Sequence, residues 1–184
     1  MSAKRFKQLA ILCLVLRFAL VAPAAHLRWV GTNADANGVG FWDSADNWDA
    51  GRIPTAADKA EVWNANSTVV VDDFDPNTAK EADNIVLAWG PPCENVTLWL
   101  NSLDGSGPGG VLNCRLIQMA ARGGKNCKIQ VDAGQLNVSG RLRTCQTGEN
   151  NSDATIIVNG GSVNLNRFNI RIKLIIILLN CHIF

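Results

Sequence analysis

The pentapeptide Gly134-Gln135-Leu136-Asn137-Val138 decides the fold, because a similar pentapeptide lies on either side of it. Gly110-Val111-Leu112-Asn113-Cys114 starts 24 residues earlier, and Gly161-Ser162-Val163-Asn164-Leu165 starts 27 residues later. Each copy consists of glycine, any residue, an aliphatic residue, asparagine and an apolar residue. A unit that recurs at this spacing is typical of a solenoid, in which each coil buries its apolar face against its neighbours.

The residues of each copy alternate between apolar and polar side chains, as they do in β-strands. In the second copy Leu136 and Val138 point to one side, whereas Gln135 and Asn137 point to the other. A short strand is also predicted over 128–131, with a counterpart one coil later over 155–158. The sequence therefore predicts an all-β fold, a right-handed parallel β-helix. Its coils are expected to occupy residues 63–168.

Glycine and asparagine have different expected roles in the repeat. Glycine stands where the chain turns a corner between strands, in backbone conformations that a β-carbon resists, at Gly110, Gly134 and Gly161. If the coils stack in register, the repeat asparagines form an amide ladder, built from Asn113, Asn137 and Asn164. We interpret this ladder as structural, and the alternative is a ligand-binding surface.

The N-terminal segment, residues 1–25, has the composition of an export signal. Lys4, Arg5 and Lys7 precede a mostly apolar stretch that is shorter than the ~20 residues a membrane-spanning helix needs. Without this segment the chain has 13 Lys and Arg against 16 Asp and Glu, a net charge of −3 with histidine neutral. We therefore expect a secreted or cell-surface protein. No membrane span after cleavage and no nucleic-acid partner are expected.

A tryptophan-rich segment, residues 26–62, precedes the coils and is expected to cap the N-terminal end of the core. Its pattern is W-x-G…W-x-x-x-x-N-W-x-x-G-x-x-P-x-x-x-D-x-A. The residues that carry this pattern are Trp29, Gly31, Trp42, Asn47, Trp48, Gly51, Pro54, Asp58 and Ala60.

Together with the coils, this pattern resembles the start of large exported bacterial β-helix proteins. These include autotransporter-like passenger domains and proteins with PEP-CTERM sorting signals. The resemblance covers residues 29–168 and implies an exported solenoid. It transfers no catalytic residue, because these families have no agreed ones.

The final segment, residues 169–184, departs from the repeat where a further coil is due. It is apolar and carries no sorting motif, and its uninterrupted apolar run, 174–179, is too short to span a bilayer. We interpret it as a tail outside the repeat. Our hypothesis is that the reading frame is truncated or shifted near Arg167.

Few residues in the chain suit catalysis or a tightly bound metal. There is no Tyr, the two histidines are His26 and His182, and no two cysteines form a C-x-x-C pair. A zinc site of Cys/His type is therefore not expected. Cys114 occupies the same repeat position as Val138 and Leu165, so we expect it to be a buried apolar residue. We assign no catalytic residue and expect no cofactor.

Two further groups of residues are weak ligand-binding candidates. Asp72, Asp73 and Asp75 can supply oxygen ligands to calcium, but their spacing differs from that of a D-x-D-x-D-G loop. A solvated acidic turn is therefore the preferred interpretation. Trp89 and Trp99 follow the cap, and their flat apolar rings can stack on sugars. Packing in the core or the cap is the preferred interpretation for both.

These observations favour a structural or adhesive surface protein. Its extended face is expected to contact polysaccharide, a surface matrix or other cells. The alternative is a carbohydrate-active β-helix enzyme, a polysaccharide lyase or hydrolase, whose catalytic coils are missing from this chain. Carboxylates and basic residues in later coils would favour the enzyme.

Overall fold

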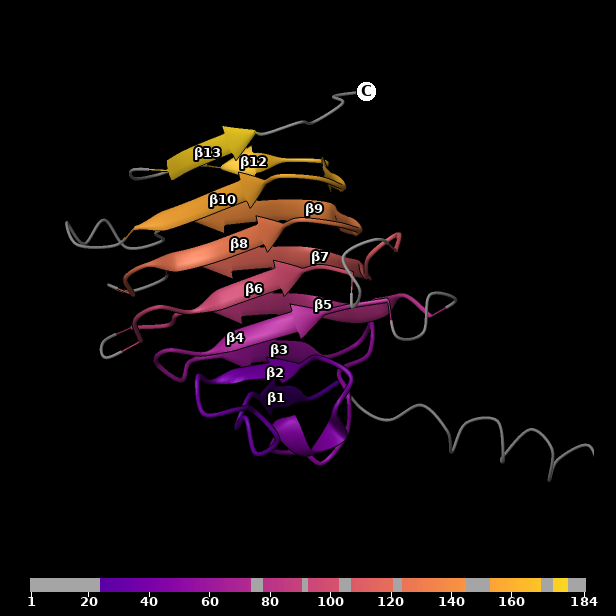
Figure 1. The fold of residues 1–184 in the computed structure, drawn as a ribbon, viewed down its shortest axis with the longest axis vertical. Helices are drawn as coiled ribbons and strands as arrows, with labels where there is room; N and C mark the ends of the chain where they lie inside the picture. The colour runs from indigo at the N-terminus through magenta and orange to yellow at the C-terminus, as the bar shows by residue number, and fades with distance from the viewer. Residues whose placement is uncertain are drawn as a thin grey trace, which may run out of the picture.

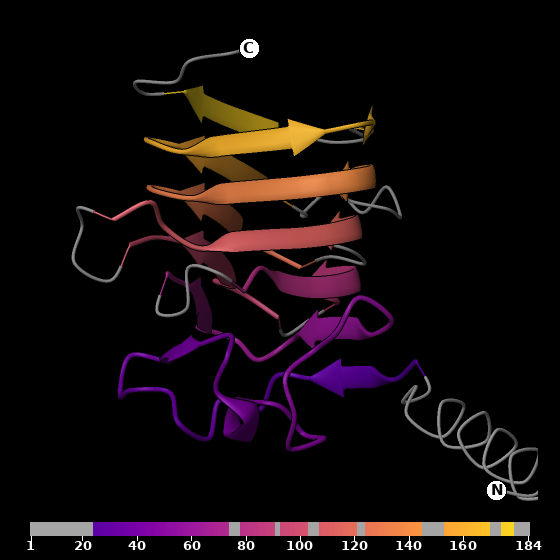
Figure 2. The same ribbon diagram turned by 90° about the vertical axis from the view of Figure 1, so that its right-hand side faces the viewer.

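The computed structural model describes residues 24–73, 78–90, 93–102, 107–120, 124–144, 153–169 and 174–178. These residues form two parallel β-sheets, and the strands of each sheet are stacked along the long axis of the molecule (Figures 1 and 2). The chain passes from one sheet to the other and back as it winds upward. The predicted all-β parallel solenoid is confirmed.

The strands divide between the sheets almost in strict alternation. The seven-stranded sheet contains β1 (His26–Arg28), β3 (Lys59–Val62), β5 (Lys80–Leu87), β7 (Val111–Met119), β9 (Gln135–Thr144), β11 (Ser162–Leu165) and β12 (Phe168–Asn169). The six-stranded sheet contains β2 (Val39–Phe41), β4 (Thr68–Val71), β6 (Thr97–Leu100), β8 (Cys127–Val131), β10 (Ala154–Val158) and β13 (Leu174–Leu178). In the part of the chain that the structure describes, the only helical element is a 3-10 turn, η1 (Ala45–Asn47).

The repeat copies lie in register across the seven-stranded sheet. Asn137 pairs with Asn113 on one neighbouring strand and with Asn164 on the other. A slip of one residue would turn every inward side chain outward, so the apolar alternation of the sequence fixes this register.

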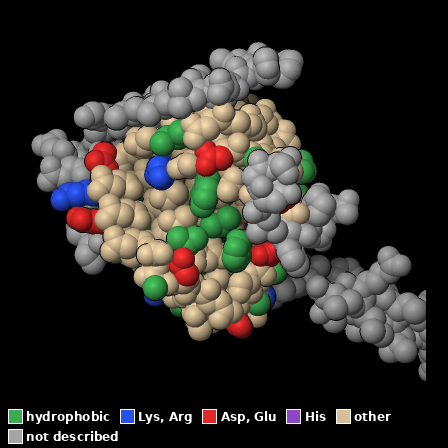
Figure 3. Space-filling view, viewed as in Figure 1, with side chains coloured by type: hydrophobic (Ala, Val, Ile, Leu, Met, Phe, Trp, Pro, Cys, Tyr) green, Lys and Arg blue, Asp and Glu red, His purple; other side chains and the backbone are tan. Residues whose placement is uncertain are grey.

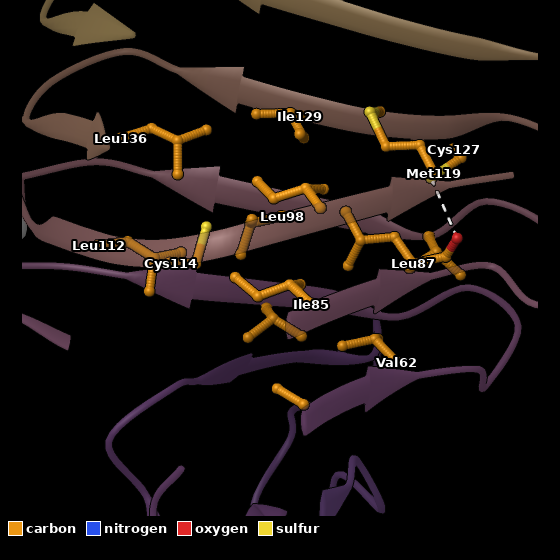
Figure 4. Close-up of a cluster of buried hydrophobic side chains, with 14 of the residues drawn as sticks. Val62, Ile85, Leu87, Leu98, Leu112, Cys114, Met119, Cys127, Ile129 and Leu136 are labelled. Atoms are coloured by element: carbon orange, nitrogen blue, oxygen red, sulfur yellow. Dashed lines mark hydrogen bonds between the residues drawn. The ribbon is translucent and has the colours of Figure 1, made fainter. Parts of the chain in front are cut away.

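The core lies between the two sheets and takes alternate residues of short strands such as β6, β8 and β10 (Figure 4). Ile85 and Leu87 point inward from β5, Leu98 from β6 and Ile129 from β8, and all four are fully buried. Burying one such side chain contributes about 1.5–3 kcal/mol. Because these side chains stack in columns along the solenoid, they hold each coil against the next.

Three tryptophans close the N-terminal end of this core. The ring of Trp48 meets those of Trp29 and Trp42 edge to face, with centroids 5.3 Å and 5.0 Å apart. The Nε1 of Trp48 donates a hydrogen bond of 2.8 Å to the carbonyl of Trp42. The same segment, residues 26–62, also supplies β1, β2 and β3. The expected boundary at residue 62 therefore does not separate the cap from the sheets.

The structure describes part of the C-terminal segment but little of the expected export signal. Residues 1–23, which make up most of the expected export signal, lie outside the described residues. Strand β13 comes from the segment expected to leave the repeat, yet it pairs in parallel with β10 from Leu174 to Leu178. The apolar run thus continues the six-stranded sheet as its edge strand. Among the described residues, no helix has the length and apolar character needed to cross a membrane.

Candidate ligand-binding surfaces

The three repeat asparagines form the ladder that their spacing predicts. The Nδ2 of Asn137 donates to the Oδ1 of Asn113 at 2.8 Å, and the Nδ2 of Asn164 donates to the Oδ1 of Asn137 at 2.8 Å. The side-chain amide of Asn137 therefore donates to the coil before it and accepts from the coil after it. These bonds between successive coils support a structural role for the ladder.

We expect the Asn137→Ala variant to lose about 1–2 kcal/mol in its free energy of unfolding, measured by urea denaturation. Asn137 takes part in two side-chain hydrogen bonds, and each contributes about 0.5–1.5 kcal/mol net. Asn164→Ala is the matched control, because the described hydrogen bonds give its side chain one ladder bond and it is exposed. Equal losses in the two variants would contradict a ladder that acts through both neighbours.

A second asparagine ladder was not found in the sequence. The Nδ2 of Asn95 donates to Asn66 at 2.7 Å, and the Nδ2 of Asn126 donates to Asn95 at 2.8 Å. All three residues have a positive φ, between 50° and 58°, which asparagine tolerates better than most residues. In the sequence, each asparagine of this ladder stands two residues before one of the paired strand residues Thr68, Thr97 and Lys128. The ladder was missed because its asparagines are separated by 29 and 31 residues rather than by a constant interval.

The repeat glycines are required where the coils touch. Gly134 and Gly161 have φ of +90° and +81°, as expected at a corner. A β-carbon on Gly134 would lie 2.1 Å from the carbonyl oxygen of Gly110. Gly110 itself has no positive φ, and the left-handed residue of that coil is Gly109. Gly110 is needed instead for close approach, because its β-carbon would lie 2.6 Å from the carbonyl of Val71.

The polar residues of the cap pattern hold the cap together. Asn47 is fully buried, and its side chain accepts the backbone N–H of Asn33 at 2.7 Å and donates to the carbonyl of Phe41 at 3.1 Å. Asp58 is also buried and binds both nitrogens of the Arg52 guanidinium at 2.6 Å and 2.8 Å. These bonds, with others from Thr55 and Ala25, hold the pKa of Asp58 well below its usual range. The pattern therefore specifies a structure rather than a reactive site.

Trp99 lies on the outer face of the six-stranded sheet rather than in the core. Its Nε1 donates to the Oδ2 of Asp132 at 2.7 Å, and the Nε2 of Gln130 donates to the same oxygen at 2.6 Å. Asp132 also accepts from the side chain of Asn159. The indole is half-buried, and this network fixes the orientation of its ring.

Two columns of side chains run across that outer face. Register places Phe41, Val70 and Trp99 in one column; Phe41 is 43% exposed, whereas Val70 is buried. The neighbouring column begins with Val39 and continues with the polar residues Thr68, Thr97, Lys128 and Thr155. Hydrophobic side chains accordingly gather in the middle of this face (Figure 3). We call these two columns, together with Gln130, the tryptophan face.

Trp89, the other stacking candidate, belongs to a different surface. It lines a hollow of about 290 Å³ beside the first strands of the seven-stranded sheet. Sequence reasoning missed its partner there, Trp63, which follows Lys59 and Glu61 at every second position and so lies on the same outward side. The structure therefore does not bring Trp89 and Trp99 together.

The acidic turn offers no metal site among the described residues. Asp72 is buried, and Asp73 accepts hydrogen bonds from the hydroxyl of Ser102 at 3.2 Å and the backbone N–H of Gly109 at 3.4 Å. Asp75 lies outside the described residues. No cluster of three or more His, Cys, Asp or Glu side chains suited to a metal ion occurs in the described ranges.

Cys93, Cys114 and Cys127 are buried. Cys114 packs in the core as predicted, and burial raises the pKa of its thiol to about 12. Cys127 directs its Sγ toward the carbonyl of Leu87 at 3.7 Å (dashed line in Figure 4). Burial likewise raises the pKa of Cys93. A thiol with a raised pKa is a poor nucleophile near neutral pH, so Cys93 and Cys114 serve packing.

Comparison of the chain with protein-family models, with curated proteins and with solved structures gives no match. The resemblance to exported bacterial β-helix proteins therefore depends on the sequence pattern alone. What the protein binds has to be argued from its two tryptophan-bearing surfaces.

Proposed function

We propose that this chain is an exported surface β-solenoid that binds polysaccharide through the tryptophan face. The observation that carries the proposal is the column of Phe41, Val70 and Trp99 on the outer face of the six-stranded sheet, in which Phe41 is exposed and Trp99 is half-buried. A soluble domain normally places such residues in its core, so an aligned apolar column outside the core suggests a contact surface. Export is proposed from the composition of residues 1–25.

The chemistry of this face suits a sugar polymer. A pyranose ring has an apolar face that packs on an indole and hydroxyl groups at its edge that need hydrogen-bond partners. Trp99 supplies the indole surface. Thr97, Thr68 and Gln130 lie nearby and supply hydrogen-bonding groups. Strands repeat every ~4.8 Å in a sheet, so the face offers similar chemistry at regular intervals. A polymer of repeated sugar units can contact this face at several of these intervals at once.

Binding to insoluble and soluble polysaccharides tests the proposal. We expect the protein to be depleted from solution by at least one of cellulose, chitin or a cell-wall glucan. We expect Trp99→Ala to weaken that binding by about tenfold or more, because a central aromatic residue often dominates an interface. Trp99→Phe, which keeps an aromatic ring, is expected to retain part of the affinity.

Ile53→Ala is the control, since Ile53 is an apolar side chain that is 37% exposed and lies outside the tryptophan face. Loss of polymer binding in Ile53→Ala but not in Trp99→Ala would contradict the proposed face, as would no binding to any polysaccharide tested. Release of new reducing ends by the protein would favour the enzyme alternative instead.

A further inference from the structure

We propose that the hollow beside β1 and β3 is a second, separate site, which binds a single neutral sugar ring. This inference extends the proposed polysaccharide binding to another surface of the molecule. The hollow is lined by two indoles, two pairs of opposite charges and a histidine, which are Trp63, Trp89, Arg28, Lys59, Asp49, Glu61 and His26. At about 290 Å³ it lies at the small end of ligand sites, which suits one ring rather than an extended chain.

The two indoles are held in place by cations. The guanidinium carbon of Arg28 lies 4.4 Å from the ring centroid of Trp63, and the ammonium of Lys59 lies 5.5 Å from that of Trp89. Both indoles are half-buried, so part of each ring lies at the surface of the hollow. Rigid aromatic rings at a hollow provide contact area with little loss of side-chain entropy on binding.

The charges in the hollow are balanced, which argues for a neutral ligand. Glu61 is almost fully buried and forms an ion pair with Lys59, and the Nδ1 of His26 lies 3.5 Å from its Oε1. The Oδ1 of Asp49 accepts the backbone N–H of Arg28 at 2.9 Å. Two fixed cations therefore face two carboxylates, and neither a strongly anionic nor a strongly cationic ligand is favoured over the other.

Donors and acceptors lie side by side at the rim. Arg28 and Asp49 are both exposed, and among the described residues the Arg28 guanidinium has no ion pair. A guanidinium offers up to five N–H donors, whereas a carboxylate only accepts. Neighbouring hydroxyl groups of a sugar can donate to Asp49 and accept from Arg28 at the same time. The indoles provide the apolar surface for the ring itself.

A titration with methyl β-glucoside, methyl β-galactoside and methyl α-mannoside tests this site. The readouts are indole fluorescence and the NMR shifts of the indole N–H groups in the full chain. We expect at least one glycoside to bind with a dissociation constant on the order of 1 mM. Trp63→Ala and Arg28→Gln are each expected to weaken that binding by about tenfold or more.

One control variant keeps this test separate from the polymer test. Arg141→Gln removes a cation from β9, outside the hollow, and is expected to leave glycoside binding unchanged. Absence of a saturable change with every glycoside, or an equal loss in Arg141→Gln, would overturn this site while leaving the tryptophan face untouched. Tighter binding of glucuronate than of the methyl glucoside would overturn the assignment to a neutral sugar.

Discussion

The Asp58→Ala variant is expected to lose about 3 kcal/mol in its free energy of unfolding, measured by urea denaturation. The Asp58 side chain is 1% exposed, and removal of one partner of a buried ion pair typically costs about 3–5 kcal/mol. We expect the lower end of this range, because Arg52 is 33% exposed and regains water. The backbone N–H groups of Thr55 and Ala25, each 2.9 Å from the carboxylate, lose their acceptor as well.

Asp83→Ala is the matched control for this variant. Asp83 forms an equally short double contact with Arg115, at 2.6 Å and 2.7 Å, but its side chain is 35% exposed. An exposed ion pair contributes about 0–1 kcal/mol. Similar losses in the Asp58 and Asp83 variants would contradict the role of burial.

The pH dependence of stability should separate wild type from Asp58→Ala. The Arg52 hydrogen bonds lower the pKa of Asp58 in the folded state below its ordinary value of 3.8. On acidification the unfolded chain therefore takes up this proton first, so the stabilisation is complete well above pH 3.8 and decreases below it. We expect the difference between the two proteins to be constant near neutral pH and to narrow as the pH falls below about 4. A difference independent of pH would contradict this explanation.

Gly134→Ala is expected to cost about 3 kcal/mol or more in the same measurement. A left-handed φ costs a non-glycine residue about 1–2 kcal/mol, and forced overpacking adds about 1–3 kcal/mol. Both apply, because Gly134 has a φ of +90° and its added β-carbon would lie 2.1 Å from the carbonyl oxygen of Gly110. That oxygen belongs to the backbone of the neighbouring coil, so it cannot move without disturbing the stack.

Gly51→Ala is the control that separates the cost of a left-handed backbone from the cost of a steric clash. Gly51 also has a positive φ, +62°, but nothing lies within 4 Å of its added β-carbon. This variant is therefore expected to lose only about 1–2 kcal/mol. If Gly134→Ala is no more destabilised than Gly51→Ala, the coils are not in the close contact that the structure shows.

Repetition made the seven-stranded sheet predictable. The pentapeptide around Asn137 has two neighbours in sequence that are also its neighbours in space, so its spacing predicted the pairing, the ladder and the burial of Cys114. Earlier coils were harder to recognise because their loops differ in length. The ladder of Asn66, Asn95 and Asn126 was missed for this reason, although its geometry is as regular.

The ligand-binding candidates show where sequence reasoning ends. Trp89 and Trp99 lie ten residues apart, and only the winding of the chain assigns them to different faces. Trp63 joins Trp89, and Asp132 fixes Trp99 from a coil 33 residues later. No sequence motif marks Trp63 or Asp132 as a partner of these tryptophans. Each contact depends on which outward-facing residues become neighbours when the coils stack.

By itself, the sequence determined that this chain winds into parallel coils with an apolar interior and a tryptophan cap. Period-two alternation and a recurring Gly-x-aliphatic-Asn unit are local signals, and each coil satisfies them through its nearest neighbours. Tertiary structure alone decided that Asp58 is buried against Arg52, that β13 continues the six-stranded sheet, and that two separate tryptophan surfaces exist. Backbone register follows from the alternation of apolar and polar residues within each strand. The neighbours of an outward side chain depend instead on the length of every intervening loop, which shifts one coil relative to the next.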